Sequence, residues 1–205
     1  MSGTEEKKPI AKWDEVAKHA LRDAATHPWR WIYVKWCAGY PLWDQSTGTW
    51  SEKVRRGWNA YAKKDGVPDA TFEAWANRMV AERAAHGVTR EELMCADCSG
   101  FVCWCIDHNM GTAYGTEEFA KMPMSGVNKQ DSLTNGPAGQ ILFKPGHCGC
   151  DGGFGVSISM ENWSHKRPAG EPDMKLAAIN EYPWEYGVKF ESKYYFVDYT
   201  GADAH

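Results

Sequence analysis

The sequence predicts an α+β fold, because helical patterns fill most of its first half and short strand patterns fill most of its second half. Residues 70–86 place apolar side chains at helical spacing along one face. Residues 147–151 and 154–161 are instead short runs that follow glycine-containing turns, which is typical of strands. The length of 205 residues is sufficient for one domain with its own hydrophobic core.

The first half of the chain is expected to be mainly helical. Residues 1–10 are polar and are expected to form a disordered arm, followed by a helix over residues 11–26. A segment dense in aromatic residues comes next, with an expected turn at Gly39–Pro41. Further helices are expected over residues 50–63 and 70–86.

The second half begins with a helix start signal. Thr89 and Glu92 have the spacing of a capping box and predict a short turn of helix. A helix is then expected over residues 98–108, and residues 111–138 are expected to form a loop with a short helical piece. The expected strands cover residues 140–144, 147–151, 154–161 and 193–199.

Composition narrows the class of protein. The net charge of −4 offers no strong field for nucleic acid. With neither an apolar leader nor a run of 18 apolar residues, we expect no signal peptide, no membrane span and synthesis in the cytoplasm. The 11 tryptophans indicate either stacking surfaces, for example for sugar rings, or an aromatic core. No repeat or linker divides the chain, so residues 11–205 are expected to form a single domain with a helical insertion at about 44–93.

Four of the seven cysteines lie close together in the segment MCADCSGFVCWCIDHN, residues 94–109. An odd number of cysteines without an export signal argues against a disulfide framework. Zinc binding is one interpretation, with the following candidate ligands: Cys95, Cys98, Cys148, Cys150 and His147. Because Cys-x-Cys is a poor zinc knuckle, we favour either burial in the core or a single catalytic thiol.

The tetrapeptide DCSG, residues 97–100, fits the interpretation of a single catalytic thiol best. Cys98 is expected at the N-terminus of a helix, where the helix dipole lowers the pKa of a thiol. The small residues Ser99 and Gly100 let a substrate approach closely, and the backbone N–H of Cys98 can stabilise an oxyanion. His147, which follows a glycine turn at the start of a strand, is the expected general base.

The segments DCSGFVCW, PAGQILFKPGHCGC and GVSISMEN resemble the NlpC/P60 family of papain-like cysteine peptidases and amidases. In that family D-C-S-G carries the nucleophile, a later G-H carries the base, and the next strand carries a third polar residue. The segment WIYVKWCAGYPL is similar to the one that precedes the nucleophile in many phage and prophage members, so the resemblance covers about residues 29–199. It implies a papain-like fold in which the nucleophile helix packs on a small antiparallel sheet.

The third catalytic residue is expected on the strand GVSISMEN. Because side chains alternate along a strand, Ser159 and Glu161 share one face, whereas Asn162 lies on the other. Glu161 is favoured, since a carboxylate would orient His147 and stabilise its imidazolium form. Ser159 and Asn162 remain the alternatives.

The resemblance implies that the protein cleaves an amide bond in the peptide stem of peptidoglycan through a Cys98 thioester, with no cofactor and no metal. Tyr33, Ser99 and Trp36 are the expected substrate-binding residues. Tyr33 matches an aromatic that borders the cleft in the family, Ser99 follows the nucleophile, and Trp36 replaces a glycine.

The sequence leaves open how the protein would reach the cell wall and which of several functions it has. An enzyme without a signal peptide would reach the cell wall after release, with a holin as its partner, or as a component of a virion. A zinc-bound structural or interaction module is one alternative function, and a transferase or deamidase on the same fold is another.

Overall fold

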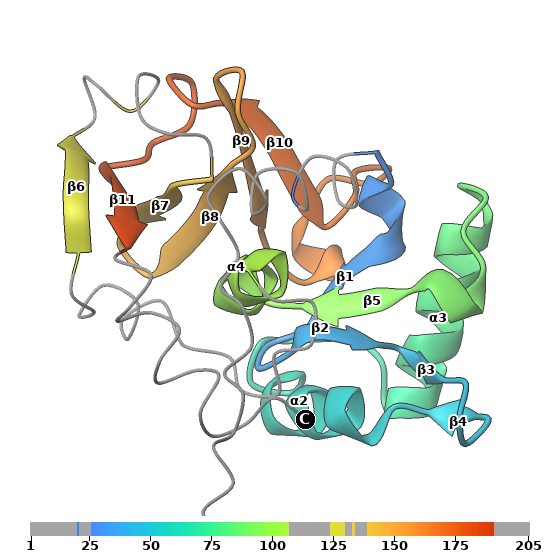
Figure 1. Ribbon diagram of the computed structural model, residues 1–205. Helices are drawn as coiled ribbons and strands as arrows, with labels where there is room; N and C mark the ends of the chain where they lie inside the picture. Colours follow the sequence, from blue (N-terminus) through green and yellow to red (C-terminus); the bar gives the residue numbers. More distant parts are fainter. Residues whose placement is uncertain (1–19, 21–25, 107–123, 130–132, 134–138, 191–205) are drawn as a thin grey trace, which may run out of the picture.

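The structure is a computed structural model with helices and sheets mixed along the chain (Figure 1). The described residues are Ala20, 26–106, 124–129, 133 and 139–190. The expected arm over residues 1–10 and the expected strand over residues 193–199 lie outside these ranges, as does the expected helix over residues 11–26 except for Ala20. The described part contains three α-helices and three sheets, which is compatible with the predicted α+β class.

The largest sheet has six strands in the order β10-β9-β8-β7-β11-β6, and all its pairs are antiparallel. Its strands are β6 (Met124–Lys129), β7 (Ile141–Lys144), β8 (His147–Asp151), β9 (Val156–Met160), β10 (Met174–Ala178) and β11 (Tyr186–Phe190). The second sheet has the order β1-β5-β2 and consists of β1 (Trp31–Tyr33), β5 (Met94–Ala96) and β2 (Ala38–Pro41). A short 3₁₀ helix, η2 (Pro28–Arg30), precedes β1.

Helix α4 (Cys98–Ile106) joins the two sheets, because it packs against β8 and β9 on one side and against β2 and β5 on the other (Figure 1). All nine of its residues are buried, and none is charged. Such a helix needs no polar face, since both sides are covered. The sequence CSGFVCWCI therefore forms the centre of the core.

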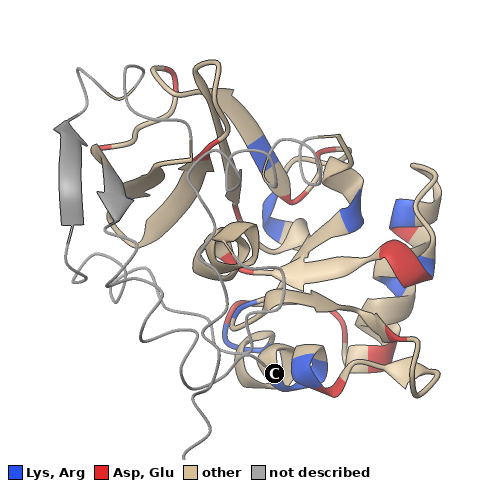
Figure 2. Cartoon of the chain, viewed as in Figure 1, with Lys and Arg blue, Asp and Glu red and all other residues tan. Residues whose placement is uncertain are grey.

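The predicted insertion contains a hairpin and two amphipathic helices. The hairpin pairs β3 (Trp43–Asp44) with β4 (Thr49–Trp50), and the helices are α2 (Glu52–Tyr61) and α3 (Phe72–Ala84). A 3₁₀ turn, η3 (Arg90–Glu92), then leads into β5 and carries the predicted capping box. Figure 2 shows Lys, Arg, Asp and Glu positions along α2 and α3, whereas the residues of α4 are uncharged. No helix in the described ranges is both long and apolar enough to cross a bilayer.

Most local predictions are confirmed where the structure describes the chain. Helices α2 and α3 fall within residues 50–63 and 70–86, and α4 begins at Cys98 as expected. Strands β7, β8 and β9 match residues 140–144, 147–151 and 154–161 to within one or two residues. The other end of the helix expected over residues 98–108 lies outside the described residues.

Two local predictions are wrong. Gly39–Pro41 belongs to strand β2 instead of a turn, because β2 is an edge strand with a bulge, where both glycine and proline are tolerated. Gly39 has a φ of 78°, and a Cβ built on it would lie 2.2 Å from the Trp104 ring. Residues 124–129, within the expected loop over residues 111–138, form strand β6.

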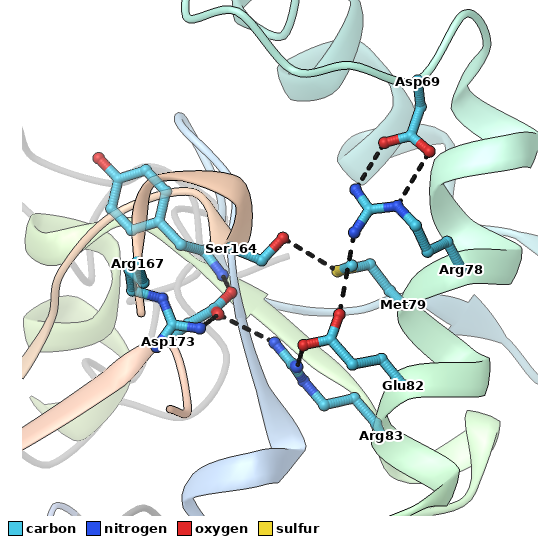
Figure 3. A network of polar contacts seen from close by, with 9 residues as sticks. Asp69, Arg78, Met79, Glu82, Arg83, Ser164, Arg167 and Asp173 are labelled. Atoms are coloured by element: carbon cyan, nitrogen blue, oxygen red, sulfur yellow. Dashed lines mark hydrogen bonds and ion pairs between the residues drawn. The ribbon is translucent and has the colours of Figure 1, made fainter. Parts of the chain in front are cut away.

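A buried ion network fastens the insertion to the larger sheet (Figure 3). Arg83 of α3 donates a 2.9 Å hydrogen bond to Asp173, and both side chains are 0% exposed. Arg167 also donates to Asp173. Since an unpaired charge inside a protein is strongly unfavourable, these groups must assemble together.

The same network extends outward and inward. Toward the surface, Arg83 donates to Glu82 at 2.7 Å, and Arg78 donates to Asp69 at 2.5 and 3.0 Å (Figure 3). Toward the interior, the second oxygen of Asp173 accepts a 2.6 Å hydrogen bond from the backbone N–H of Tyr33. Asp173 thus connects α3, the start of β10 and the end of β1.

We expect Asp173→Asn to lower the free energy of unfolding by about 3 kcal/mol or more, because it removes the buried carboxylate charge that pairs with both Arg83 and Arg167. Chemical denaturation followed by circular dichroism measures the change. Glu91→Gln is the matched control, since it removes a carboxylate from the exposed Arg90–Glu91 pair, and its unfolding midpoint should stay near that of the wild type. Equal midpoints for the two variants would contradict a fastening role for Asp173.

Candidate active site

The turn that presents Cys98 is built around the side chain of Asp97. One carboxylate oxygen accepts hydrogen bonds from the Gly100 N–H at 2.7 Å and the Ser99 hydroxyl at 3.1 Å. The other oxygen accepts from the Trp36 N–H at 2.8 Å. Asp97 is therefore the N-cap of α4, and it accepts from the Gly100 N–H, one of the groups that the first turn of a helix leaves unpaired.

Gly100 allows α4 to lie directly against the chain at Cys37. A Cβ at position 100 would lie 1.9 Å from the Cys37 carbonyl oxygen, a distance that no side chain can occupy. The same carbonyl accepts a 3.0 Å hydrogen bond from the Asp97 N–H. The two small residues after Cys98 thus serve the packing of the helix start, and Cys98 itself is 9% exposed.

His147 and Glu161 face each other across neighbouring strands. In the β8–β9 pair, Cys150 lies opposite Ile158 and Asp151 lies opposite Ser157. The same register, continued toward the start of β8, puts His147 opposite Glu161. Nε2 of His147 lies 3.4 Å from a carboxylate oxygen of Glu161, which is an ion-pair contact and not an aligned hydrogen bond.

The two side chains shift each other's pKa toward the charged forms. Burial alone would lower the pKa of His147, but the contacts with Cys98 and with the charge of Glu161 outweigh it and raise this pKa to about 9. Burial alone would raise the pKa of Glu161, but the His147 contact lowers it to about 2. Cys98 thus lies close enough to act on the imidazole, and all three predicted residues meet at one site.

Glu161 is held by two further donors on its own side of the sheet. The Ser159 hydroxyl donates to it at 2.5 Å, which confirms that Ser159 and Glu161 share a face. The Tyr182 hydroxyl donates to both carboxylate oxygens at 2.8 and 2.9 Å, and Lys144 donates to the Tyr182 oxygen at 2.8 Å. Burial and the charge of Glu161 raise the pKa of Tyr182, so its hydroxyl remains a donor.

The imidazole is also fixed by an aromatic neighbour. The ring of Trp184 stacks on His147 with centroids 5.5 Å apart and planes 6° apart. Tyr182 in turn contacts Trp184 at 4.6 Å. The sequence gives no direct sign of this pair, because the loop that carries both residues returns to β8 and β9 from a distant position in the chain.

The three expected substrate-binding residues lie in different surroundings. Tyr33 is buried near the site, where burial and the charge of Cys98 raise the pKa of its phenol. Ser99 is buried and its hydroxyl is engaged with Asp97. Trp36 is 68% exposed, and its backbone N–H donates the hydrogen bond to Asp97 described above. The alternative third residue Asn162 instead accepts a 3.0 Å hydrogen bond from the Trp163 N–H.

The other cysteines are part of the core. All seven cysteines of the chain are buried. Burial raises the pKa values of the Cys37 and Cys95 thiols well above the ordinary value of a cysteine. Within the described ranges, no three histidine, cysteine, aspartate or glutamate side chains gather into a group that could hold a metal ion, so the Cys95 and Cys148 segments do not converge into the ligand set of the zinc interpretation.

No family model matches this chain, and no match was found among the curated proteins or the solved structures. The resemblance to the NlpC/P60 family therefore rests on the residues around Cys98 and His147.

We expect Glu161→Gln to lower the pKa of His147 from about 9, because the substitution removes the carboxylate charge that stabilises the imidazolium. Histidine-selective NMR titration measures this pKa without any substrate. Tyr182→Phe is the control, since it removes a hydrogen bond to Glu161 but leaves the charge, and the pKa of His147 should stay raised. An unchanged pKa in Glu161→Gln would show that the carboxylate does not act on His147.

The same pair predicts how stability depends on pH. The raised pKa of His147 stabilises the fold fully below pH 6.5, and this contribution disappears as pH rises through about 9. The lowered pKa of Glu161 stabilises the fold above pH 4.5, and this contribution disappears as pH falls toward about 2. The difference in unfolding free energy between wild type and Glu161→Gln, measured with urea, should therefore be largest between pH 4.5 and 6.5. A difference that does not vary with pH would rule out the ion pair as its source.

Proposed function

We propose that this protein is a cysteine-dependent amide hydrolase with a papain-like arrangement of the NlpC/P60 type. One observation carries the proposal: Cys98 begins a buried helix beside an imidazole that is itself paired with Glu161. Nucleophile, base and orienting carboxylate are the three parts that activated thiol enzymes need. The packing of α4 on β8 and β9 supports the papain-like comparison.

In the first half of the proposed reaction, the Cys98 sulfur attacks the carbonyl carbon of the amide as a thiolate. A C–S bond forms, and the carbonyl electrons move to oxygen. The His147 imidazolium then gives its proton to the amide nitrogen, the C–N bond breaks, and the amine leaves. The acyl group remains on sulfur as a thioester.

In the second half, His147 takes a proton from water, and the resulting hydroxide attacks the thioester carbon. The C–S bond breaks, a carboxylic acid leaves, and the thiolate–imidazolium pair is restored. Because Glu161 lies at Nε2 of His147, Nδ1 is the nitrogen that exchanges the proton on the Cys98 side. Glu161 stabilises the imidazolium in both halves.

Two features support stabilisation of the oxyanion. Cys98 is the first residue of α4, so the positive end of the helix dipole lies close to its sulfur, and the backbone N–H of Cys98 is the proposed donor to the oxyanion. The raised pKa of Tyr33 keeps its phenol protonated, so this buried side chain can donate a hydrogen bond at the site. These roles require no metal ion or cofactor.

The proposed substrate is the peptide stem of peptidoglycan. This assignment rests on the resemblance of DCSGFVCW and the segment around His147 to cell-wall hydrolases of phages and prophages. Under this proposal the protein acts on the wall after release from the cytoplasm, with a holin as partner, or as part of a virion.

The test is digestion of purified peptidoglycan with mass spectrometry of the products. The wild-type protein should release fragments that carry a new amine and a new carboxylate, whereas Cys98→Ala should reduce the rate by roughly a thousandfold or more. Cys105→Ala is the control, because it removes a buried cysteine elsewhere on the same helix and should retain activity.

Different outcomes separate the parts of the proposal. Iodoacetamide should modify Cys98 before any other cysteine, and rapid labelling of another thiol would contradict the assigned nucleophile. Rapid labelling of Cys98 without digestion of peptidoglycan would reject the substrate and leave the thiol assignment in place. Products in which an added amine replaces the leaving amine would identify a transferase.

A further inference from the structure

Trp36 combines exposure with a strained backbone. Its φ of 69° lies in the left-handed region, and the side chain is 68% exposed. Residues with a Cβ lose roughly 1–2 kcal/mol in this conformation, which glycine adopts freely. The indole therefore gains little from burial, and its backbone is strained. An exposed aromatic held in this way points to a contact made with another molecule.

Specific contacts fix the direction of the indole. The Trp36 N–H is bound by Asp97, and the ring packs edge-on against Tyr61 with centroids 5.2 Å apart. Lys35 and Lys64 lie 5.3 and 5.4 Å from the Tyr61 ring centre. We call Trp36, Tyr61, Lys35 and Lys64 the Trp36 platform.

The platform carries polar groups beside its apolar face. The Lys35 ammonium is paired with Asp65 at 2.9 to 3.1 Å. Asp65 also accepts a 2.7 Å hydrogen bond from the Trp163 indole. A paired ammonium and carboxylate next to an exposed indole offer donors and acceptors at the edge of a flat apolar surface.

The platform lies close to the proposed nucleophile. Asp97, which binds the Trp36 N–H, immediately precedes Cys98 in the chain. The covalent length of this link places the Trp36 backbone within roughly 10 Å of the Cys98 backbone. A sugar bound on the indole would thus be within reach of a peptide chain whose amide is attacked by Cys98.

We infer that the Trp36 platform binds the sugar ring to which the peptide substrate is attached. The inference rests on the proposed function and adds a requirement for the glycan. A pyranose ring presents a face of C–H groups that packs on an indole, and its hydroxyl and acetamido groups at the ring edges can bond to polar side chains such as the Lys35–Asp65 pair, whose ammonium lies by the Tyr61 ring that Trp36 contacts. A bare peptide has no flat apolar face that would use the indole in this way.

The test compares the disaccharide-linked stem peptide with the same peptide without sugar. Trp36→Gly removes the ring and also relieves the backbone strain, so a folding defect is not expected. It should lower the ratio of kcat/KM for the sugar-linked substrate to that for the bare peptide by about tenfold, mainly through KM. Trp36→Phe, which keeps an aromatic ring, should recover part of this ratio.

Phe154 provides a matched control. It also has a positive φ, of 54°, and is 100% exposed, but it lies in the β8–β9 turn at the opposite end of β8 from His147. Phe154→Gly should leave the ratio unchanged. An unchanged ratio in Trp36→Gly, or an equal loss with both substrates, would overturn the sugar assignment.

Binding separates this inference from the proposed reaction. Calorimetry with the sugar-linked peptide should give about tenfold weaker affinity for Cys98→Ala combined with Trp36→Gly than for Cys98→Ala alone. Equal affinities would overturn the platform even if the wild type is an active hydrolase. If the wild type cleaves neither substrate, the proposed function fails, and the affinity difference still decides whether the platform binds sugar.

Discussion

The carboxylate of Asp97 is the interaction on which the rest of the site depends. It is buried, and burial together with the charge of Cys98 raises its pKa to about 6. Three donors from Trp36, Ser99 and Gly100 compensate for that burial. Without the carboxylate, the N–H groups of Gly100 in α4 and of Trp36 would lose the acceptor that they share. The start of α4 at Cys98 and the backbone at Trp36 are therefore both attached to one capped turn.

The part of the site formed by His147 and Glu161 depends on the register of two strands, whereas the part around Cys98 depends on the Asp97 cap. His147 begins β8 and Glu161 directly follows β9, so the antiparallel register of these two strands brings the side chains together. A change of register by one residue would turn one of them to the other face. The hydroxyls of Ser159 and Tyr182 donate hydrogen bonds to the Glu161 carboxylate, and the Trp184 ring stacks on the His147 imidazole. The expected orienting group is thus built into the sheet.

Sequence patterns predicted the parts that depend on short-range rules. The periodicity of α3 and the boundaries of β8 and β9 arise within a few residues, and strand alternation correctly placed Glu161 on the face of Ser159. Gly39–Pro41 was misassigned because turn residues also occupy bulged edge strands. Tyr182 and Trp184 were missed because no spacing rule encodes a contact between a loop and distant strands. The catalytic roles remain predictions, since geometry alone does not measure a rate.

Asp173 explains how the two halves of the site stay aligned. Its backbone carbonyl accepts the N–H of Glu161 at 3.0 Å, and its side chain accepts the N–H of Tyr33 at 2.6 Å. Arg83 of the insertion binds the other oxygen of the same side chain. Tyr33 is the last residue of β1, and Glu161 directly follows β9 in the sheet that contains His147, so Asp173 contacts both parts of the site. Catalytic groups lose much of their effect when displaced by about 1 Å, so a buried link of this kind is what a site divided between two sheets requires. Helix α3, which carries Arg83, therefore supports the alignment of the candidate site.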